Sequence, residues 1–564
     1  MPVLTPPRRT TGTAPTTLQR SKPPEGVRLT PDASVLRAGP GGRAATATAT
    51  AGAAGAGAPG RDRHLDLLRA VAIVAVVVGH WLVVVPTFGA DGFSGSNALE
   101  QVGSMRGLTW FFQVMPLFFV VGGVANARSW RSAKGRGEGY GVWLNTRLRR
   151  LAEPSLWLFG VGAVLAVGLR AAGVDPGQVH LLAWLVTVPV WFLAVYVFVI
   201  AGAPLMLKAH DKFGPWVLPT LLARVVFVDV MRFRSGVSVL TYSNFLWVFL
   251  FCQQLGFLWL DGKVPSNRFR QASLALGGVG AMTLLVAFGP YPLSLVGVPG
   301  EAVQNNAPPT LMLLVAGVVQ LSVALLLRPL CVGLPQRRRV WAAVIGLNAH
   351  AMTILLWHFT ALVVASAVVL PLGIIPSTLP GSLPWWLVRA AMLVLYLVPL
   401  VGLVWGFGRI ERRALLGDGR PVRSLPSTVS TAAGGLSFAA GCAAVTVGGL
   451  SDQGSPLGVP VVAVLPLAGG WLLIWGFGRR RRNADAQTQL LPRPPTRGDS
   501  TRQGRMRGEV RGWVNEELSV DSINRCSPDS CANPEVGRAS RRPASPLAAS
   551  SSSSSTNGAS GPSC

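Results

Sequence analysis

The sequence is dominated by apolar runs about twenty residues long, and these runs restrict the chain to folds built inside a lipid bilayer. A helix of that length spans the ~30 Å hydrocarbon core of a bilayer. Only 13% of the 564 residues are charged and 50% are hydrophobic, whereas roughly 25% charged is usual for soluble proteins. These features exclude a soluble enzyme, a DNA-binding protein and a secreted disulfide scaffold.

Twelve of these runs are candidate membrane-spanning helices, and together they predict an all-α, polytopic transmembrane bundle. About ten spans form its core and two more follow near the C-terminal end. The runs lie near residues 65–87, 108–127, 154–172, 181–206, 216–230, 241–260, 271–289, 310–327, 340–370, 384–406, 433–450 and 457–477. The fifth run is short and carries Arg224 and Asp229, and the eleventh is rich in glycine and alanine.

The net charge of +27 indicates how the bundle is oriented. With the amino terminus inside, the inward-facing loops and the flank of the last span hold 25 Lys and Arg residues, and the outward-facing loops hold four. Cationic loops stay on the cytoplasmic side of membrane proteins. We therefore expect both termini in the cytoplasm and no nucleic-acid partner, since the positive charge is explained by topology.

Two polar segments flank the apolar part of the chain. Residues 1–60 are rich in Pro, Thr, Ala and Gly, and residues 483–564 are polar and contain a run of serines. Such compositions are typical of disordered tails. We predict a membrane core over residues 61–410 and two additional spans over residues 411–482, with a disordered tail on either side.

The first span carries charged side chains where they are costly, by about 2.5–3.5 kcal/mol each on the insertion scale. Asp66 and Arg69 lie near its predicted cytoplasmic start and His80 lies deep inside. Arg69 and His80 are eleven residues apart, which places them within ~20° of one line on a helix and ~16 Å apart along it. A polar stripe that joins helices by hydrogen bonds is one explanation. The other is a catalytic face with His80 as general base.

The segment NTRLRRLAEP, residues 145–154, follows the second span and concentrates positive charge. Arg147, Arg149 and Arg150 are either topology charges or an anion clamp, since the guanidinium fork matches phosphate oxygens. A phosphorylated cytoplasmic donor such as a coenzyme A thioester requires such a clamp.

The ninth span contains His358, at a depth comparable to that of His80. The two imidazoles are therefore expected to line one cavity; the alternative is a histidine bonded to a neighbouring backbone carbonyl. The proline-rich segment 289–310 is expected to be an ordered outer loop, either covering a site or acting as a rigid connector. The six histidines form no metal-ligand spacing, so no metal site is indicated.

The chain resembles the acyltransferase-3 family of integral-membrane acyltransferases over roughly residues 60–410. The resemblance depends on LDLLRAVAIVAVVVGH, where Arg69 and His80 have the family's spacing, and on MPLFFVVGGVANA, RLRRLAEP, VPVWFLAVY and LWHFTAL in the expected order. The chain departs from the family at Gly122, where many members have serine, and at Leu148 within the basic block.

The resemblance implies transfer of an acyl group from cytoplasmic acyl-CoA, acetyl-CoA first among them, to a hydroxyl of an envelope glycan, a lipid or a secondary metabolite. His80 is then the general base, and Arg69 binds donor phosphate or steadies the oxyanion. Arg147 and Arg150 hold the coenzyme A phosphates, with Asp66 and His358 as further site residues. We expect an O-acyltransferase of a bacterial plasma membrane.

A small-molecule transporter is the alternative function, because twelve spans with both ends inside is also the plan of many carriers. Carriers usually contain two related halves. LDLLRA and VVVGH have no counterpart in the second half of the chain. The sequence therefore favours the acyltransferase.

Overall fold

The computed structural model describes residues 62–235, 238–416, 427–454, 458 and 460–476. The predicted tails, residues 1–60 and 483–564, lie outside the described residues. The longer helices are α2 (Arg63–Val83), α5 (Met115–Gly135), α6 (Tyr140–Ala171), α7 (Pro176–Thr187), α8 (Trp191–Phe213), α9 (Val217–Ser235), α11 (Asn244–Leu260), α12 (Arg268–Phe288), α13 (Leu311–Cys331), α14 (Arg338–Ala349), α15 (Ala351–Val369), α16 (Leu383–Leu416), α17 (Thr428–Gly448) and α18 (Val461–Trp471).

Short elements connect these helices. They are the strands β1 (Val84–Gly89) and β2 (Gly92–Asn97), the helices α3 (Ala98–Gln101), α4 (Thr109–Phe112) and α10 (Ser238–Thr241), the 3-10 turns η1 (Gly103–Leu108), η2 (Val188–Val190), η3 (Gly214–Trp216), η4 (Leu334–Gln336) and η5 (Leu370–Leu372), and the π-helical turn η6 (Leu472–Gly476).

The predicted all-α membrane bundle is confirmed. Within the described residues, ten stretches are long and apolar enough to cross a membrane. The longest, Pro176–Ser235, contains two of the predicted spans, because the chain turns at Gly214 (φ +58°) between α8 and α9. The ten stretches thus account for eleven predicted spans, and the twelfth corresponds to the shorter apolar helix Val461–Trp475.

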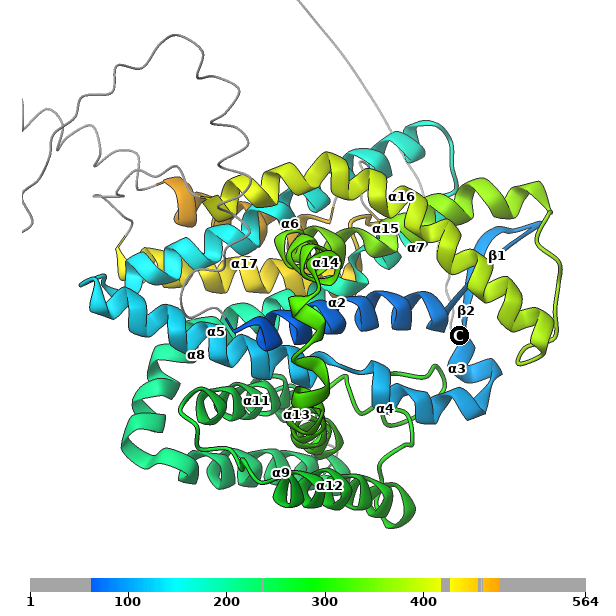
Figure 1. Ribbon diagram of the computed structural model, residues 1–564. Coiled ribbons are helices and arrows are strands. Elements are labelled where there is room, and N and C mark those ends of the chain that lie inside the picture. Colours follow the sequence, from blue (N-terminus) through cyan, green and yellow to red (C-terminus); the bar gives the residue numbers. More distant parts are fainter. Residues whose placement is uncertain (1–61, 236–237, 417–426, 455–457, 459, 477–564) are drawn as a thin grey trace, which may run out of the picture. The chain divides into compact units, whose positions relative to one another are not determined.

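Two groups of helices pack on either side of α2 and α5 (Figure 1). One group consists of α9, α11, α12 and α13, which pack against one another and reach α5 through α11 and α13. The other contains α6, α7, α15, α16 and α17, and it contacts α2 through α15 and α16. Helix α8 packs against both groups, through α17 and α11. Helix α2 therefore has packed neighbours on more than one side, which suits the helix that carries the predicted catalytic residues.

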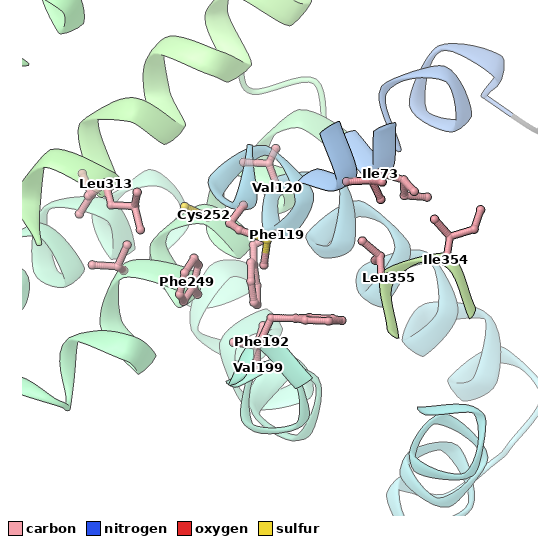
Figure 2. Close-up of a cluster of buried hydrophobic side chains, with 14 of the residues drawn as sticks. Ile73, Phe119, Val120, Phe192, Val199, Phe249, Cys252, Leu313, Ile354 and Leu355 are labelled. Atoms are coloured by element: carbon pink, nitrogen blue, oxygen red, sulfur yellow. The ribbon is translucent and has the colours of Figure 1, made fainter. Parts of the chain in front are cut away.

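Apolar side chains from both groups meet in the core (Figure 2). Phe119 of α5 and Phe249 of α11 stack with their ring centroids 4.1 Å apart and their planes inclined by 25°, and both rings are fully buried. On the other side of α5, Ile73 of α2 lies near Ile354 and Leu355 of α15 (Figure 2). This packing fixes α2 against α15.

Three local features differ from the sequence-based expectation. Helix α6 begins at Tyr140 instead of near residue 154, so the arginines of RLRRLAEP lie on a helix and not in a loop. The predicted span 340–370 is broken at His350, between α14 and α15. The segment after α2 forms a two-stranded antiparallel hairpin, with Phe88 opposite Phe93. The hydropathy pattern contains no signal for any of the three.

Candidate active site

Helix α2 carries three of the predicted site residues and is anchored at both ends. At its start, the Asp62 carboxylate accepts a hydrogen bond from the backbone N–H of His64 (3.0 Å), as an N-cap residue does. At its end, the Arg389 guanidinium of α16 donates to the backbone oxygens of Trp81 (2.7 Å) and Leu82 (3.0 Å). A cation at this position pairs with carbonyl groups that a helix end leaves free.

The structure brings His80 and His358 into direct contact. His80 Nδ1 lies 2.9 Å from His358 Nε2, and the two rings are nearly parallel, 14° apart. Trp81 follows His80 and donates its indole N–H to the backbone oxygen of His358 at 2.9 Å. The ring of Phe359 packs against both imidazoles. The pair is therefore held from both of its helices.

The α15 side of this contact is also fixed. His358 is fully buried and its Nδ1 lies 2.9 Å from the backbone oxygen of Leu355. At the start of α15, the buried Glu411 carboxylate accepts hydrogen bonds from the backbone N–H of Met352 (2.9 Å) and the N–H and hydroxyl of Thr353. An acidic group at a helix start accepts hydrogen bonds from N–H groups that have no helical partner, and its negative charge interacts favourably with the helix dipole.

A cavity of about 860 Å³ surrounds the histidine pair. Its lining is mostly apolar, and the β1–β2 hairpin and the segment 289–310 contribute polar side chains such as Ser94, Gln304 and Asn306. The hairpin is held by Gln178 of α7, which accepts from the Phe93 N–H (2.8 Å). The expectation that His80 and His358 line one cavity is confirmed, and the segment 289–310 lies over it.

The cavity follows α2 toward the other end of the helix. Ala72, Ile73, Val76 and His80 all line it. Arg69 itself does not line it, but Ala72 is only three residues away, less than one helical turn. The cavity thus extends from the hairpin to within one turn of the arginine.

Three arginines gather near the start of α2, and we call Arg69, Arg147 and Arg150 the arginine cluster. Arg147 is close enough to the other two for their positive charges to repel. It donates to the backbone oxygen of Ala125 (3.2 Å), and the buried Nε of Arg150 has no partner among the described residues. A buried unpaired donor beside like charges fits an anion-binding site.

Arg149 and Asp66 have other surroundings. Arg149 points toward the C-terminal helices, where it donates to the backbone oxygen of Ile474 (3.0 Å). The backbone oxygen of Asp66 accepts from Asn348 Nδ2 (2.8 Å), which joins α2 to α14. No group of three His, Cys, Asp or Glu side chains that could hold a metal ion occurs in the part of the chain that the structure describes.

A family model described as an acyltransferase domain matches residues 62–404. The chain belongs to the acyltransferase-3 family. No curated protein and no solved structure matches it. The expected family membership is confirmed, and this member is a membrane acyltransferase, an enzyme that transfers acyl groups.

The structure shows the surroundings of the two departures from the family's motifs in this acyltransferase-3 member. A Cβ atom on Gly122 would lie 3.4 Å from the nearest atom, in the Tyr196 ring, which is an ordinary contact, so nothing in the structure explains why glycine stands there. Leu148 is buried, and a Cβ atom on Gly435 of α17 would lie 3.0 Å from it. Leu148 therefore packs against α17 and not within the arginine cluster.

Three residues around the site were not predicted from the sequence of this acyltransferase-3 member. The sequence does contain a signal for Arg389, because it is a lone charge in the apolar run LPWWLVRAAMLVLYL. A charged residue within a membrane span usually has a structural or functional role. The signal for Glu411 is weaker, because this residue lies at the end of the same span, where charged residues are less costly. Trp81 has no such signal, since the chain contains 18 tryptophans and tryptophan is common near the ends of membrane spans.

Proposed function

We propose that this acyltransferase moves an acyl group from acyl-CoA to a hydroxyl of an acceptor held in the cavity, with His80 as general base. The observation that carries the proposal is the contact of His80 with His358 inside a cavity large enough for a small acceptor. A general base needs to lie within hydrogen-bond reach of the proton that it removes. The cavity gives an acceptor access to the His80 ring.

The donor enters from the end of the bundle that holds the arginine cluster. Its phosphates bind Arg147 and Arg150, and its flexible pantetheine arm extends along α2 toward His80. Arg69 and His80 are separated by eleven residues, a rise of ~16 Å, and the cavity covers most of that length. The positive charge of this end supports its placement in the cytoplasm, with both termini on that side.

The transfer itself requires one proton to move twice. His80 takes the proton of the acceptor hydroxyl as the oxygen attacks the thioester carbonyl. The tetrahedral intermediate then collapses, the C–S bond breaks, and the coenzyme A thiolate takes the proton from His80. The products are an ester and free coenzyme A, and no metal or redox partner takes part in these steps. The acceptor is an envelope glycan, a lipid or a secondary metabolite.

A labelling assay with membranes that contain the protein tests this proposal. They are supplied with radiolabelled acetyl-CoA, and label is measured in the lipid, polysaccharide and small-molecule fractions. We expect label with the wild type and at least a 10²-fold loss with His80→Ala, since general acid–base catalysis contributes 10²–10⁴-fold. His180→Ala is the matched control, because His180 binds the backbone oxygen of Ser451 and does not line the cavity.

Two outcomes contradict the proposal. Equal labelling by the wild type and His80→Ala, at equal expression, would exclude His80 as the base. No labelling of any fraction with a panel of acyl-CoA donors of different chain length would exclude acyl-CoA as the donor. Uptake of a small molecule into vesicles in the absence of acyl transfer would instead support the transporter alternative.

A further inference from the structure

The hydrogen bonds of the histidine pair determine which nitrogen of each ring carries a proton. A backbone carbonyl only accepts hydrogen bonds. His358 Nδ1, 2.9 Å from the oxygen of Leu355, must therefore be the protonated nitrogen of that ring. A neutral imidazole carries one N–H, so His358 Nε2 has a free lone pair.

The same argument continues to His80. His358 Nε2 is an acceptor and lies 2.9 Å from His80 Nδ1, so His80 Nδ1 must be the donor. His80 Nε2 then holds the lone pair, and it has no hydrogen-bond partner among the described residues. Because the His80 ring lines the cavity, the basic nitrogen is the one available to an acceptor.

We propose that His358 is a positioning residue that holds His80 in the Nδ1–H tautomer, with Nε2 ready to take a proton from the acceptor. This inference rests on the proposed function. In the serine protease triad an aspartate orients the histidine in the same way. Here a neutral imidazole, that of His358, orients the base. No buried carboxylate is then needed next to His80 in apolar surroundings. A buried charge without a partner is costly.

The role of His358 changes when His80 takes the proton. The acceptor O–H bond breaks and the Nε2–H bond forms, which leaves a positive charge on the His80 ring. Nδ1–H then donates a stronger, charge-assisted hydrogen bond to His358 Nε2. The proton on Nε2 later goes to the departing thiolate, and both rings return to their starting state. In these steps His358 acts only through His80 and exchanges no proton with the donor or the acceptor.

The surroundings of the pair keep the two nitrogens aligned. The Trp81 N–H holds the backbone of His358, and Phe359 packs against both rings. The ring centroids are 5.1 Å apart. Preorganised groups of this kind need no rearrangement at the moment of reaction.

The tautomer is measured directly by NMR, which needs no enzymatic activity. Protein labelled with ¹⁵N-histidine is purified in nanodiscs, and the His80 signals are assigned by comparison with His80→Gln. We expect His80 in the Nδ1–H form in the wild type, and in His358→Leu a shift toward the Nε2–H form. An Nε2–H tautomer of His80 in the wild type would overturn the inference, whatever the activity of the protein.

Two substitutions of His358 test the consequence for catalysis. His358→Gln keeps an acceptor oxygen for His80 Nδ1–H, whereas His358→Leu provides none. We expect kcat to fall on the order of 10²-fold in His358→Leu, with an unchanged KM for acyl-CoA, and to be largely retained in His358→Gln. Thermal unfolding of both variants shows whether they are folded.

The outcomes separate this inference from the proposed function. A folded His358→Leu variant with full activity, or equal loss in both folded variants, overturns the positioning role while leaving His80 as the base. A wild type without acyl transfer overturns the proposed function, and the NMR result then decides the tautomer by itself.

Discussion

Arg389 is a buried cation in an apolar helix, and the end of α2 accounts for its position. Its guanidinium donates to the backbone oxygens of Trp81, Leu82 and Val84. The oxygens of Trp81 and Leu82 belong to the last turn of α2, directly after His80, where the carbonyl groups of a helix have no helical partner. A buried polar group left without a hydrogen bond costs about 1–3 kcal/mol. Arg389 therefore stabilises the part of α2 that places the histidine.

Replacing Arg389 by leucine is expected to lower both stability and activity. We predict a loss on the order of 2 kcal/mol in the free energy of unfolding, and a lower kcat because the end of α2 frays. Thermal unfolding followed by tryptophan fluorescence measures the first effect. Arg409→Leu is the matched control, since Arg409 lies on the same helix and is exposed over the Trp405 ring. Equal midpoints for the two variants would contradict the prediction.

Asp261, at the end of α11, forms an ion pair with Arg131 and a hydrogen bond with His210. The Arg131 guanidinium binds its carboxylate through two nitrogens, at 2.6 and 3.1 Å, and His210 Nε2 lies 3.0 Å away. These contacts, and above all the hydrogen bond from Arg131, hold the pKa of the Asp261 carboxyl below its usual range. A carboxyl whose pKa is lower in the folded than in the unfolded state stabilises the folded protein at pH values above its unfolded pKa. This stabilisation is lost as the pH falls through its folded pKa.

We therefore expect acid to remove the contribution of Asp261. Asp261→Asn is predicted to unfold at a lower temperature than the wild type at about pH 7, and the difference is predicted to narrow below about pH 4. Thermal unfolding in a non-ionic detergent across this range measures the gap. A gap of constant size at every pH would show that the carboxylate charge is not what stabilises this site.

At the residue scale, the sequence indicated the two histidines but not what holds them. His80 and His358 stand out because imidazoles are rare in otherwise apolar runs. Both explanations considered for His358 are correct at once, since it binds a backbone carbonyl and also lines the cavity. The contact of Arg389 with Trp81 joins residues 308 positions apart, and no local pattern encodes such a contact. The catalytic roles of Arg69, His80, Arg147 and Arg150 stay predictions.

At the element scale, α5 and α11 approach each other closely at glycines. A Cβ atom added to Gly123 would collide with the backbone oxygen of Gln253, and one on Gly256 would collide with the oxygen of Val120. Small residues allow membrane helices to pack backbone to backbone. Gly122, one position earlier, has more room.

The neighbouring glycines Gly122 and Gly123 give a matched pair of variants. We expect Gly123→Ala to separate α5 from α11 and to destabilise the protein by about 1–3 kcal/mol, as overpacking does. Gly122→Ala is expected to have little effect. Thermal unfolding of both purified variants measures the difference, and equal destabilisation by the two would contradict the close approach.

Element boundaries were harder to predict than element number. The chain from Tyr140 to Pro154 is too charged for a hydropathy pattern to count as membrane, yet it continues α6 in one helix. The opposite error occurs near His350, where α14 ends inside the run 340–370 that the hydropathy pattern predicts as one span, although Asn348 and His350 are polar. Both arise because hydropathy reports the solvent around a segment and not its backbone geometry.

At the scale of the whole molecule, the two C-terminal spans pack onto the bundle. Helix α17 contacts α6, α7 and α8, and Asn145 and Arg149 both donate to the backbone oxygen of Ile474. Phe438 and Cys442 of α17 are fully buried. These contacts answer a question that the sequence left open, whether spans eleven and twelve join the rest. The domain boundaries themselves stay a prediction.

Truncation tests the importance of these helices. A chain ending at residue 426 loses α17 and α18 and exposes the apolar faces that they cover, so we expect aggregation on size-exclusion chromatography in detergent. A chain ending at Thr488 keeps every contact between described residues and is expected to elute as the full chain does. A monodisperse, active protein from the shorter chain would contradict the prediction.

The apolar wall of the cavity has a consequence for the cell as well as for the reaction. Ile73 and Leu355 line the cavity where it runs toward the arginine cluster. A continuous column of water along this path would conduct protons and dissipate the potential across the membrane, since only apolar packing makes a charge costly there. We therefore expect the apolar side chains that line the cavity also to limit proton flow along it. Substitutions that widen the cavity for a bulkier acyl group are therefore expected to increase proton leakage across the membrane.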